Sequence, residues 1–510
     1  MSAMSQITPV RRSTIADLIR RTAGRTPEAT AVVFGDRTWS YRGLDDAVTA
    51  LARHLLGLGL VPGDRVAAIG LNSDLYALTF LACARAGLVH VPVNFQMRGD
   101  ELDYFFTDSG AKAVFADAAL AEHVRATPTG AVLEVRTFED LLPVVTAPEV
   151  PRAGDDEFAV TDTDIAQLLY TSGTTSAPKG AIMTHRALVH HYLSCLDGLD
   201  LSAEDRWVHA LPLYHSAQMH VFLLPALITG AYSVIVPSPV PDELLTLIEE
   251  QRITSFFAAP TVWVAMAHNP RLTEADLSSL RRAYYGASIM PGPVLERLRT
   301  ALPELGFYNC FGQSEMGPLC TVLRPEEHDD HPGSAGRPAL FVEAKVVDSQ
   351  GDEVGPGEQG EIVYRSPHLC EGYWNKPEAT QEAFRTGWFH SGDLVVRDAD
   401  GFVEVVDRVK DVINTGGVLV ASRQVEDAVF ELEEVAEVAV VGVPDDKWIE
   451  AITAFVVRKP GVGDDQLTAT TVTDHVRSRL APFKVPKAVH FVEELPKNTA
   501  GKILKRRLRS

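Results

Sequence analysis

The length, composition and charge of this chain limit its fold and its partners. Its 510 residues are too many for a single hydrophobic core, so two or more domains are expected. The apolar content of 46% and the charged content of 23% are typical of a soluble globular protein. The formal net charge of −21 argues against a nucleic-acid partner, because phosphate groups would be repelled over most of the surface.

The cysteines and the apolar runs indicate the compartment. The five cysteines are scattered, and no two form a Cys-x-x-Cys pair, which favours a reducing environment over a disulfide framework or a zinc site. Residues 1–16 lack the apolar core of a signal peptide. Residues 221–237 are uncharged, but Pro225 and Gly230 interrupt them, which predicts a buried helix and a buried strand instead of a membrane span. We therefore expect a cytoplasmic protein.

Helical patterns and short apolar runs alternate over most of the chain. Residues 31–34 and 37–41 flank a turn at Gly35-Asp36, which predicts a β-hairpin. Further strands are expected at residues 65–69, 89–93, 113–115, 165–169, 232–236, 253–257, 282–285 and 306–308, and helices at 15–25, 44–58, 77–86 and 186–196. This alternation predicts an α/β fold with a parallel sheet covered on both faces. Residues 126–164, rich in prolines, glycines and acids, are expected to be connecting structure.

The character of the sequence changes near its C-terminal end. Residues 360–365 begin a more β-rich region. Beyond it, strands are expected at residues 401–406, 438–442, 451–457 and 488–492, and helices at 423–432 and 473–480. Ser422 is expected to be the N-cap of the first of these helices. This pattern predicts a small α+β domain, with an N-terminal domain over residues 1–408 and a C-terminal domain over residues 409–510.

One polar loop follows the buried strand at residues 165–169. It reads Tyr170-Thr-Ser-Gly-Thr-Thr-Ser-Ala-Pro-Lys-Gly180. Small residues let backbone N–H groups approach an anion, hydroxyls add donors, and Lys179 adds a compact positive charge. The pattern differs from the nucleotide P-loop, which requires Gly-Lys-Ser/Thr at its end. A phosphate-binding loop and a polar surface loop both fit the composition, and the order of the residues favours phosphate.

This segment closely resembles the Thr-Ser-Gly-Thr-Thr-Gly-x-Pro-Lys-Gly signature of the adenylate-forming enzymes. That superfamily includes acyl-CoA synthetases, firefly luciferase and nonribosomal adenylation domains. Further segments resemble its motifs in the family's order: residues 309–315 its Asn-x-aromatic-Gly-x-Thr-Glu motif, 390–393 its Thr-Gly-Asp motif, 407–411 its hinge block, and 496–502 its Pro-x-x-x-x-Gly-Lys motif. The resemblance is strongest to an acyl-CoA synthetase. It implies a large domain of packed α/β sheets with a β-rich subdomain, and a small mobile C-terminal lid domain.

The resemblance also implies a reaction and its cofactors. A carboxylate is a poor electrophile, and joining it to the α-phosphate of ATP, with pyrophosphate leaving, makes a mixed anhydride. The thiol of CoA can then attack that anhydride. Such a protein must hold a triphosphate, a purine and Mg²⁺, and must neutralise charge on the phosphates. The implied cofactors are therefore ATP, Mg²⁺ and CoA, and the partner is a small carboxylic acid.

Residues for each task follow from the same motifs. The phosphates are assigned to Thr171, Ser172, Gly173, Thr174, Thr175 and Lys179. The purine is assigned to Gly286, Ala287, Ser288, Asn309, Phe311, Gly312 and Ser314, because small residues admit a flat ring and Phe311 offers a stacking face. The ribose and its phosphate are assigned to Asp393 and Arg408. Glu315 and Thr171 are assigned to Mg²⁺, with Glu315 also catalytic.

Three further roles complete the implied site. Lys502 is catalytic, because its compact charge on a flexible stem suits the α-phosphate and the carboxylate. His215, in Pro212-Leu-Tyr-His-Ser216, is assigned as a gate beside the acyl tunnel. Lys410 is the hinge, and Gly416 and Gly417 help to form the pantetheine tunnel after the small domain turns. Each of these residues alone is compatible with an ordinary structural or solvated role.

Three positions depart from the family pattern. Ser176 replaces a glycine in the phosphate loop, Ser422 stands where proline is common, and Leu419 stands where Asn or Gln is common. If position 176 needs a positive φ, serine costs about 1 kcal/mol or more and weakens pyrophosphate binding. One alternative is therefore a protein that performs only the thioester-forming half-reaction, starting from a preformed acyl-adenylate.

Other functions remain open within and outside this class. The acceptor thiol could belong to a separate acyl-carrier protein instead of CoA, and a luciferase-like oxygenase is a further alternative. A non-catalytic nucleotide-binding regulator could keep the same fold, although Lys179, Glu315, Asp393 and Lys502 are all retained. The acid is expected beside parts of residues 209–220, Trp263 and residues 284–288, where apolar and aromatic residues prevail, which favours a hydrophobic acid. The sequence leaves the oligomeric state open, and a homodimer is the commonest form among soluble oligomers.

Overall fold

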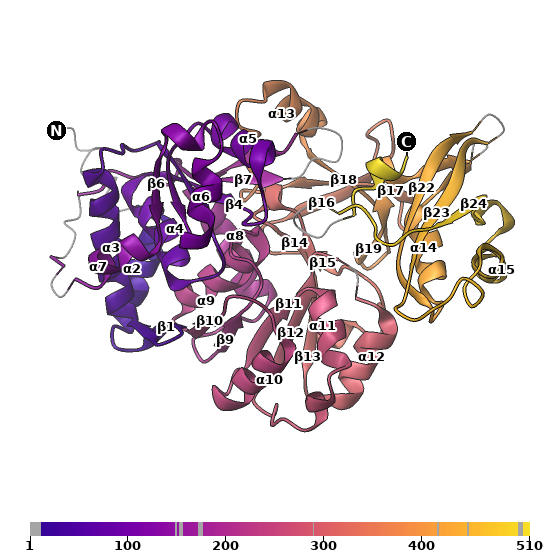
Figure 1. Ribbon diagram of the computed structural model, residues 1–510, viewed down its shortest axis with the longest axis horizontal. Coiled ribbons are helices and arrows are strands. Elements are labelled where there is room, and N and C mark those ends of the chain that lie inside the picture. The colour runs from indigo at the N-terminus through magenta and orange to yellow at the C-terminus, as the bar shows by residue number, and fades with distance from the viewer. Residues whose placement is uncertain are drawn as a thin grey trace. The chain divides into compact units, whose positions relative to one another are not determined.

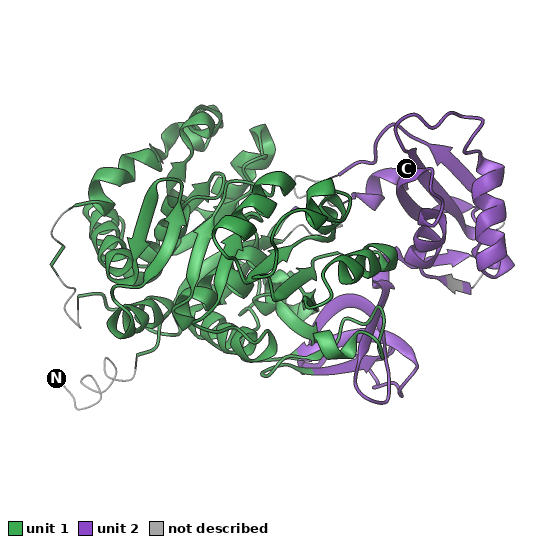
Figure 2. Ribbon diagram, turned by 90° about the horizontal axis from the view of Figure 1, so that it is seen from below, with its two compact units in different colours: residues 1–172, 178–343, 365–385 green, residues 173–177, 344–364, 386–510 purple. Residues whose placement is uncertain are grey.

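The computed structural model describes residues 12–147, 150–151, 157–171, 177–288, 290–415, 418–445, 448–497 and 503–509. The chain divides into two compact units (Figure 2). Unit 1 comprises residues 1–172, 178–343 and 365–385, and unit 2 comprises residues 173–177, 344–364 and 386–510. Unit 2 groups residues 344–364 and 386–408 with the C-terminal residues, so the domain boundary near residue 408 stays a prediction.

The first sheet of unit 1 has six strands in the order β6-β5-β3-β4-β7-β8. The strands are β3 (Arg65–Ile69), β4 (Val89–Val93), β5 (Ala111–Ala116), β6 (Glu134–Thr137), β7 (Ile165–Thr171) and β8 (Lys179–Thr184). Neighbours are parallel except β7 and β8, which are antiparallel. Strand β6 lies inside the stretch that was expected to be connecting structure. It is an edge strand without a buried residue, so its sequence lacks the apolar run of a central strand.

The second sheet of unit 1 has nine strands in the order β15-β14-β13-β12-β11-β9-β10-β1-β2. The strands are β1 (Thr30–Phe34), β2 (Arg37–Ser40), β9 (Arg206–His209), β10 (Tyr232–Ile235), β11 (Ser255–Ala258), β12 (Arg282–Gly286), β13 (Gly306–Gly312), β14 (Leu319–Leu323) and β15 (Arg337–Pro338). Its central strands are parallel, while β2 at one end of the sheet and β14 and β15 at the other pair antiparallel with their neighbours. The predicted α/β class is confirmed.

Helices pack against both sheets (Figure 1). They are α2 (Ile15–Arg25), α3 (Tyr41–Gly57), α4 (Asp74–Ala86), α5 (Gly99–Ser109), α6 (Ala118–Arg125), α7 (Leu142–Val145), α8 (His185–Gly198), α9 (Leu224–Thr229), α10 (Pro241–Glu250), α11 (Pro260–Ala267), α12 (Gly292–Ala301) and α13 (Pro377–Ala383). The uncharged run at residues 221–237 begins inside a π-helix, Ala217–Leu223, and continues through α9 and β10, which confirms the predicted helix and strand. Among the described residues, no helix has the length and apolar character needed to cross a bilayer.

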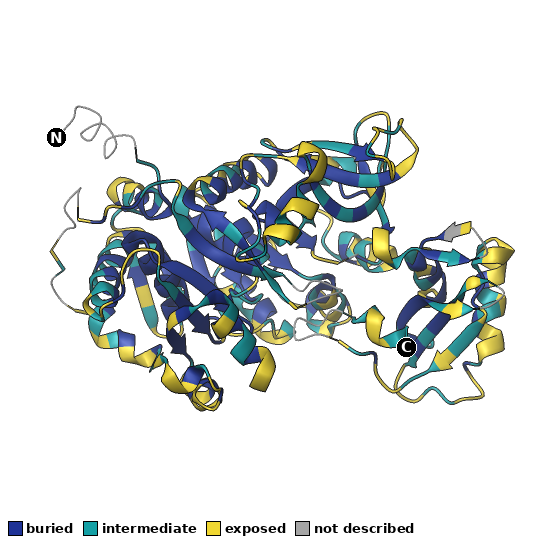
Figure 3. Ribbon diagram, turned by 90° about the horizontal axis from the view of Figure 1, so that it is seen from above, coloured by how far each residue is buried: buried dark blue, intermediate teal, exposed yellow. Residues whose placement is uncertain are grey.

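One of the hydrophobic clusters of unit 1 contains helix α4. All thirteen residues of α4 are buried, and Figure 3 shows buried residues concentrated in the sheets and the inner helices. Arg85 and Asp74 are the two charged residues of this helix, and Asp74 occupies its first position. Its carboxylate receives two hydrogen bonds from Arg37, at 2.6 and 2.7 Å, and one from Trp39 Nε1 at 2.8 Å. A buried charge needs such partners because its desolvation is costly.

Unit 2 contains two further sheets. The first has the order β16-β17-β18-β19, with β16 (Glu343–Val347), β17 (Gln359–Arg365), β18 (Phe389–Arg397) and β19 (Val403–Arg408). The second consists of β20 (Ile413–Thr415), β21 (Val418–Val420), β22 (Val435–Asp445), β23 (Ile449–Arg458) and β24 (Ala488–Phe491). Helices α14 (Ser422–Phe430) and α15 (Ala469–Arg479) complete the second group. The β-rich region and the α+β pattern agree with expectation.

The start of helix α14 corrects one prediction. Ser422 is the first residue of the helix and not its N-cap, and its hydroxyl donates to Asp407 Oδ2 at 2.8 Å. The same Oδ2 accepts the N–H of Arg423 at 3.3 Å, so the Asp407 carboxylate satisfies the open end of the helix. Lys505 Nζ lies 2.6 Å from Ser422 Oγ and therefore ties the C-terminal tail to this helix.

Candidate active site

The predicted phosphate loop connects the paired ends of β7 and β8. Thr171, the last residue of β7, pairs with Lys179, the first residue of β8. Four predicted phosphate contacts, Ser172, Gly173, Thr174 and Thr175, and the departure at Ser176 lie outside the described residues. The antiparallel pairing nevertheless places Thr171 and Lys179 opposite each other, at the two ends of the loop.

Glu315 lies at the centre of a small polar cluster in unit 1. It is 8% exposed, and its Oε1 accepts the Thr171 hydroxyl at 3.1 Å and the Tyr373 hydroxyl at 3.0 Å. Lys179 Nζ lies 5.2 Å from the centroid of the Tyr373 ring, a cation–π contact. Three predicted site residues therefore meet here. Tyr373 was not predicted, because a single tyrosine after a loop carries no sequence pattern.

Two buried histidines form hydrogen bonds with the backbone at the short turn that carries Glu315 and at the strand that follows it. Leu319 N–H donates to His191 Nε2 at 3.0 Å, and His368 Nδ1 lies 2.6 Å from the carbonyl oxygen of Met316. Burial holds the pKa of His191 well below its ordinary value and lowers that of His368 to about 4. Both rings are therefore neutral at physiological pH and support the turn without adding charge.

A contact between two serine hydroxyls joins residues 212–216 to the motif at residues 309–315. Ser216 Oγ and Ser314 Oγ are 2.9 Å apart. The neighbouring His215 accepts the N–H of Ala217 at Nδ1, 3.3 Å away, which leaves the proton of a neutral ring on Nε2. Surrounding protein lowers the pKa of His215 by desolvation, although its side chain remains accessible to solvent. His215 can thus donate from Nε2 to a polar group beside it.

The ends of β12 and β13 lie side by side and carry the residues predicted to bind the purine. Asn309 donates through Nδ2 to the carbonyl oxygen of Ser334 at 2.8 Å, which orients its amide, and Phe311 is half-buried. Ala287 and Ser288 are exposed just beyond β12, and Ala287 has a left-handed φ of 64°. Such a φ is strained for alanine and is common at functional sites.

Two predicted glycines are required by close backbone approach. A Cβ on Gly286 would lie 2.1 Å from the carbonyl oxygen of Cys310, and one on Gly312 would lie 1.9 Å from that of Pro318. Both distances are far below van der Waals contact, so any side chain would force the strands apart. The glycines therefore set the spacing of β12, β13 and β14 at the site.

Gly286→Ala is expected to lower the free energy of unfolding by about 1–3 kcal/mol, because the added methyl must displace β13. Gly292→Ala is the matched control, since a Cβ there meets no atom within 4 Å. Urea denaturation of both variants measures the difference. Equal midpoints for the two variants would show that the approach of β12 and β13 is not constrained as described.

Unit 2 holds the residues predicted to bind the ribose. Asp393 on β18 pairs with Arg408 on β19, and Arg408 Nε lies 2.7 Å from Asp393 Oδ1. Lys410, the predicted hinge, is exposed, and its carbonyl oxygen accepts Arg509 at 3.2 Å. Gly416, Gly417 and Lys502 lie outside the described residues, so their roles stay predictions.

Two residues expected to line the acid tunnel, Trp263 and His209, are buried. Trp263 is fully buried and donates through Nε1 to the carbonyl oxygen of Tyr284 at 3.1 Å. His209 is also buried, with Gln218 and Ser233 at 2.9 and 3.1 Å from its two ring nitrogens. Their polar atoms are already satisfied inside the fold.

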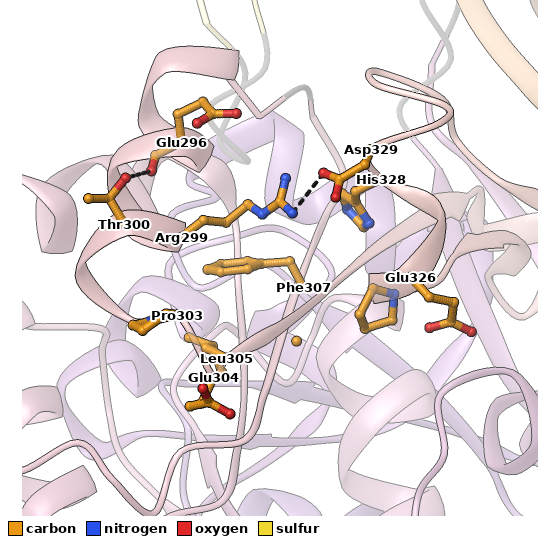
Figure 4. A pocket seen from close by; sticks show the side chains of 12 residues that line it. Glu296, Arg299, Thr300, Pro303, Glu304, Leu305, Phe307, Glu326, His328 and Asp329 are labelled. Atoms are coloured by element: carbon orange, nitrogen blue, oxygen red, sulfur yellow. Dashed lines mark hydrogen bonds and ion pairs between the residues drawn. The ribbon is translucent and has the colours of Figure 1, made fainter.

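A surface pocket lies elsewhere in unit 1, between α12 and the start of β13 (Figure 4). Arg299 crosses it to Asp329 at 2.8 Å, and Phe307 forms its floor. None of the predicted site residues lines this pocket, so it is separate from the candidate site.

Family models identify the chain. The model described as AMP-binding enzyme matches residues 19–374, and the model described as AMP-binding enzyme C-terminal domain matches residues 424–502. The chain therefore belongs to the AMP-binding enzymes, the adenylate-forming superfamily that the sequence motifs indicate, and the resemblance is confirmed.

Named relatives cover almost the whole chain. It is 38% identical over 491 residues to a feruloyl-CoA synthase from Amycolatopsis sp, covering 96% of this chain and 97% of that protein. It is 33% identical over 510 residues to an indoleacetate–CoA ligase from Aromatoleum aromaticum, covering 96% of each. The crystal structure of ATP-bound MatB from Rhodopseudomonas palustris matches with a TM-score of 0.88 and 31% identity, covering 97% of this chain and 98% of that one.

Proposed function

We propose that this chain is an acyl-CoA synthetase that activates an aromatic carboxylic acid with ATP and transfers the acyl group to CoA. The observation that carries the proposal is the cluster at the ends of the phosphate loop, where a hydroxyl, a carboxylate and a lysine gather around Thr171, Glu315 and Lys179. The names of two relatives, which specify feruloyl and indoleacetate groups, support an aromatic acid within the hydrophobic class predicted from sequence.

The residues of unit 1 would bind and orient ATP. Lys179 and the hydroxyl of Thr171 face the phosphates, Phe311 stacks on the purine, and Asn309, with its Nδ2 held by Ser334, presents Oδ1 to the purine amino group. Mg²⁺ fits the donor set of Glu315 and Thr171, because both supply hard oxygens and Mg²⁺ keeps waters and phosphate oxygens as its other ligands. When bound, the ion neutralises charge on the phosphates.

The first half-reaction would join the acid to AMP. A carboxylate oxygen attacks the α-phosphorus, the bond to the β-phosphate oxygen breaks, and pyrophosphate leaves with that oxygen. Lys502 would offset the charge that gathers on the α-phosphate and would keep the two anions together. Asp393 would accept the ribose hydroxyls and Arg408 would contact the ribose or its phosphate, two residues already adjacent on β18 and β19.

The second half-reaction would transfer the acyl group. The CoA thiolate attacks the carbonyl carbon, the bond from that carbon to the phosphate-linked oxygen breaks, and AMP leaves with that oxygen. Lys410 would be the pivot on which the C-terminal domain turns, so that Lys502 leaves the site and Gly416 and Gly417 help to form the pantetheine tunnel. His215, whose Nε2 carries its proton, would gate the acid.

A substrate panel tests this function. Ferulate, indoleacetate and a medium-chain fatty acid are each incubated with ATP, Mg²⁺ and CoA, and pyrophosphate and thioester are measured. We expect acid-dependent pyrophosphate release and a higher kcat/KM for the aromatic acids. Absence of release with every acid, together with thioester formation from synthetic acyl-adenylates, would assign only the second half-reaction. Release without acyl-CoA would move the acceptor to a carrier protein.

A further inference from the structure

The last turns of helix α5 reach both strands that flank the phosphate loop, and Figure 1 shows α5 beside β7. On one side, the Tyr170 hydroxyl donates to Asp108 Oδ2 at 2.8 Å, and Tyr170 directly precedes Thr171. On the other side, the Tyr104 hydroxyl donates to the carbonyl oxygen of Pro178 at 2.8 Å, and Pro178 directly precedes Lys179. We call residues 170–171 and 178–179 the two arms of the loop. Helix α5 therefore contacts each arm at the residue that directly precedes a candidate site residue, Thr171 or Lys179.

Asp108 also connects these arms to the Glu315 cluster. Its Oδ1 accepts Lys376 Nζ at 2.6 Å, and the aspartate side chain is only 8% exposed. Lys376 lies three residues after Tyr373, whose hydroxyl donates to Glu315. Because Thr171 also donates to Glu315, the contacts close a ring around the loop arms: Glu315, Thr171, Tyr170, Asp108, Lys376 and Tyr373.

Backbone hydrogen bonds also join the segment around Tyr373 to strand β8. Trp374 N–H donates to the carbonyl oxygen of Gly180 at 2.8 Å, and Ile182 N–H donates to that of Gly372 at 2.9 Å. The segment that carries Tyr373 and Lys376 is therefore fixed along β8. A displacement of either side chain would be transmitted to the first residues of that strand.

The position of Asp108 is unfavourable for its own helix. It lies in the last turn of α5, where the exposed carbonyl groups disfavour a negative charge, and that turn contains no basic residue. Its hydrogen-bond partners, Tyr170 and Lys376, both belong to the ring around the loop. A charge that breaks a local rule and finds its partners at a functional site is more readily explained by that site than by helix stability.

We propose that Asp108 and Tyr104 are positioning residues for the phosphate loop, which hold its two arms at the separation that pyrophosphate binding requires. This inference rests on the proposed function. Preorganised donors bind an anion without paying the cost of ordering at each turnover, so the anchors would act on the steps in which pyrophosphate is present. Acyl transfer from a preformed acyl-adenylate contains no pyrophosphate and would not depend on them.

Measuring the two half-reactions separately therefore distinguishes a loss of loop positioning, which affects only the first, from a loss of protein stability, which affects both. The test variants are Asp108→Asn and Tyr104→Phe, and the matched control is Asp103→Asn. Asp103 lies on the same helix and is also partly buried, but it accepts Thr129 N–H at 2.7 Å and does not contact the loop arms. ATP–pyrophosphate exchange in the presence of the acid measures the first half-reaction, and thioester formation from synthetic acyl-adenylate and CoA measures the second.

For Asp108→Asn we expect the KM values for ATP and pyrophosphate to rise about tenfold, because a charge-assisted contact is lost. The KM for the acid and the rate of thioester formation stay at the wild-type values, and Asp103→Asn matches the wild type throughout. Tyr170→Phe should reproduce the effect, since its ring keeps the contact with Phe105 at 4.6 Å between centroids. If Asp108→Asn does not fold, Tyr170→Phe tests the same contact in its place.

Two results would overturn the inference while leaving the proposed function intact. The first is an unchanged KM for ATP in both Asp108→Asn and Tyr170→Phe. The second is an equal loss in both half-reactions, which would indicate a general effect on stability. Absence of exchange in the wild-type protein would overturn the proposed function itself, and with it this inference.

Discussion

Glu315→Gln is expected to lower the rate of ATP-dependent acyl-adenylate formation by about 10²- to 10³-fold. The substitution keeps the shape of the side chain and leaves an oxygen that can accept the hydroxyls of Thr171 and Tyr373. It removes the negative charge, which is the feature that attracts Mg²⁺ beside the phosphates and is worth several kcal/mol in such sites. Pyrophosphate release measured over a range of Mg²⁺ concentrations should show a weaker apparent Mg²⁺ affinity.

Glu361→Gln provides a comparison in a different environment. Glu361 is a partly buried glutamate on β17, and within unit 2 its carboxylate accepts His390 Nδ1 at 2.7 Å and the N–H of Gly392 at 2.8 Å. We expect adenylate formation by this variant to stay close to the wild-type rate. A Glu315→Gln variant that keeps the wild-type rate and Mg²⁺ dependence would remove Glu315 from the catalytic site.

Lys502→Ala is expected to reduce adenylate formation by at least about a hundredfold while sparing thioester formation from synthetic acyl-adenylate. The lysine would stabilise charge on the α-phosphate in the first transition state, and removal of one such contact typically costs this much. In the second half-reaction its place would be taken by other residues of the C-terminal domain. Single-turnover measurements of both half-reactions on one preparation of the variant give the two rates directly.

Lys497→Ala is the matched control for the lysine. Lys497 lies five positions earlier in the same tail and forms a half-exposed ion pair with Glu437 at 2.7 Å, an interaction of small energetic value. It should leave both rates unchanged. Equal losses in Lys497→Ala and Lys502→Ala would show that the tail as a whole, and not the Lys502 charge, supports adenylation.

Most parallel strands of the two sheets of unit 1 could be predicted because their sequences are mostly apolar, but β9, β8 and β14 were not predicted. β3 and β4 occupy the predicted ranges, and β5 and β12 differ from theirs by at most two residues at either end. β6 was missed because it is an edge strand with alternating polar residues. Ser422 was misassigned as an N-cap because the group that satisfies the helix belongs to Asp407, fifteen residues earlier, which only the folded chain brings near.

In the candidate site, too, residues in local motifs could be predicted from the sequence, and residues that act through tertiary contacts could not. Thr171, Lys179 and Glu315 belong to motifs that could be recognised in the sequence, and the structure brings the three together. Tyr373 and Asp108 belong to none of the predicted motifs. Their importance follows from single contacts across long sequence separations, such as Lys376 with Asp108, which no local pattern encodes.

The most direct test of the account follows the oxygen atoms of the acid. The acid is labelled with ¹⁸O in its carboxylate and converted to the thioester with ATP and CoA, and the phosphate-containing products are analysed by mass spectrometry. Attack on the α-phosphorus predicts one ¹⁸O in AMP and none in pyrophosphate. Label in inorganic phosphate or pyrophosphate, or AMP without label, would contradict an acyl-adenylate intermediate and with it the proposed function.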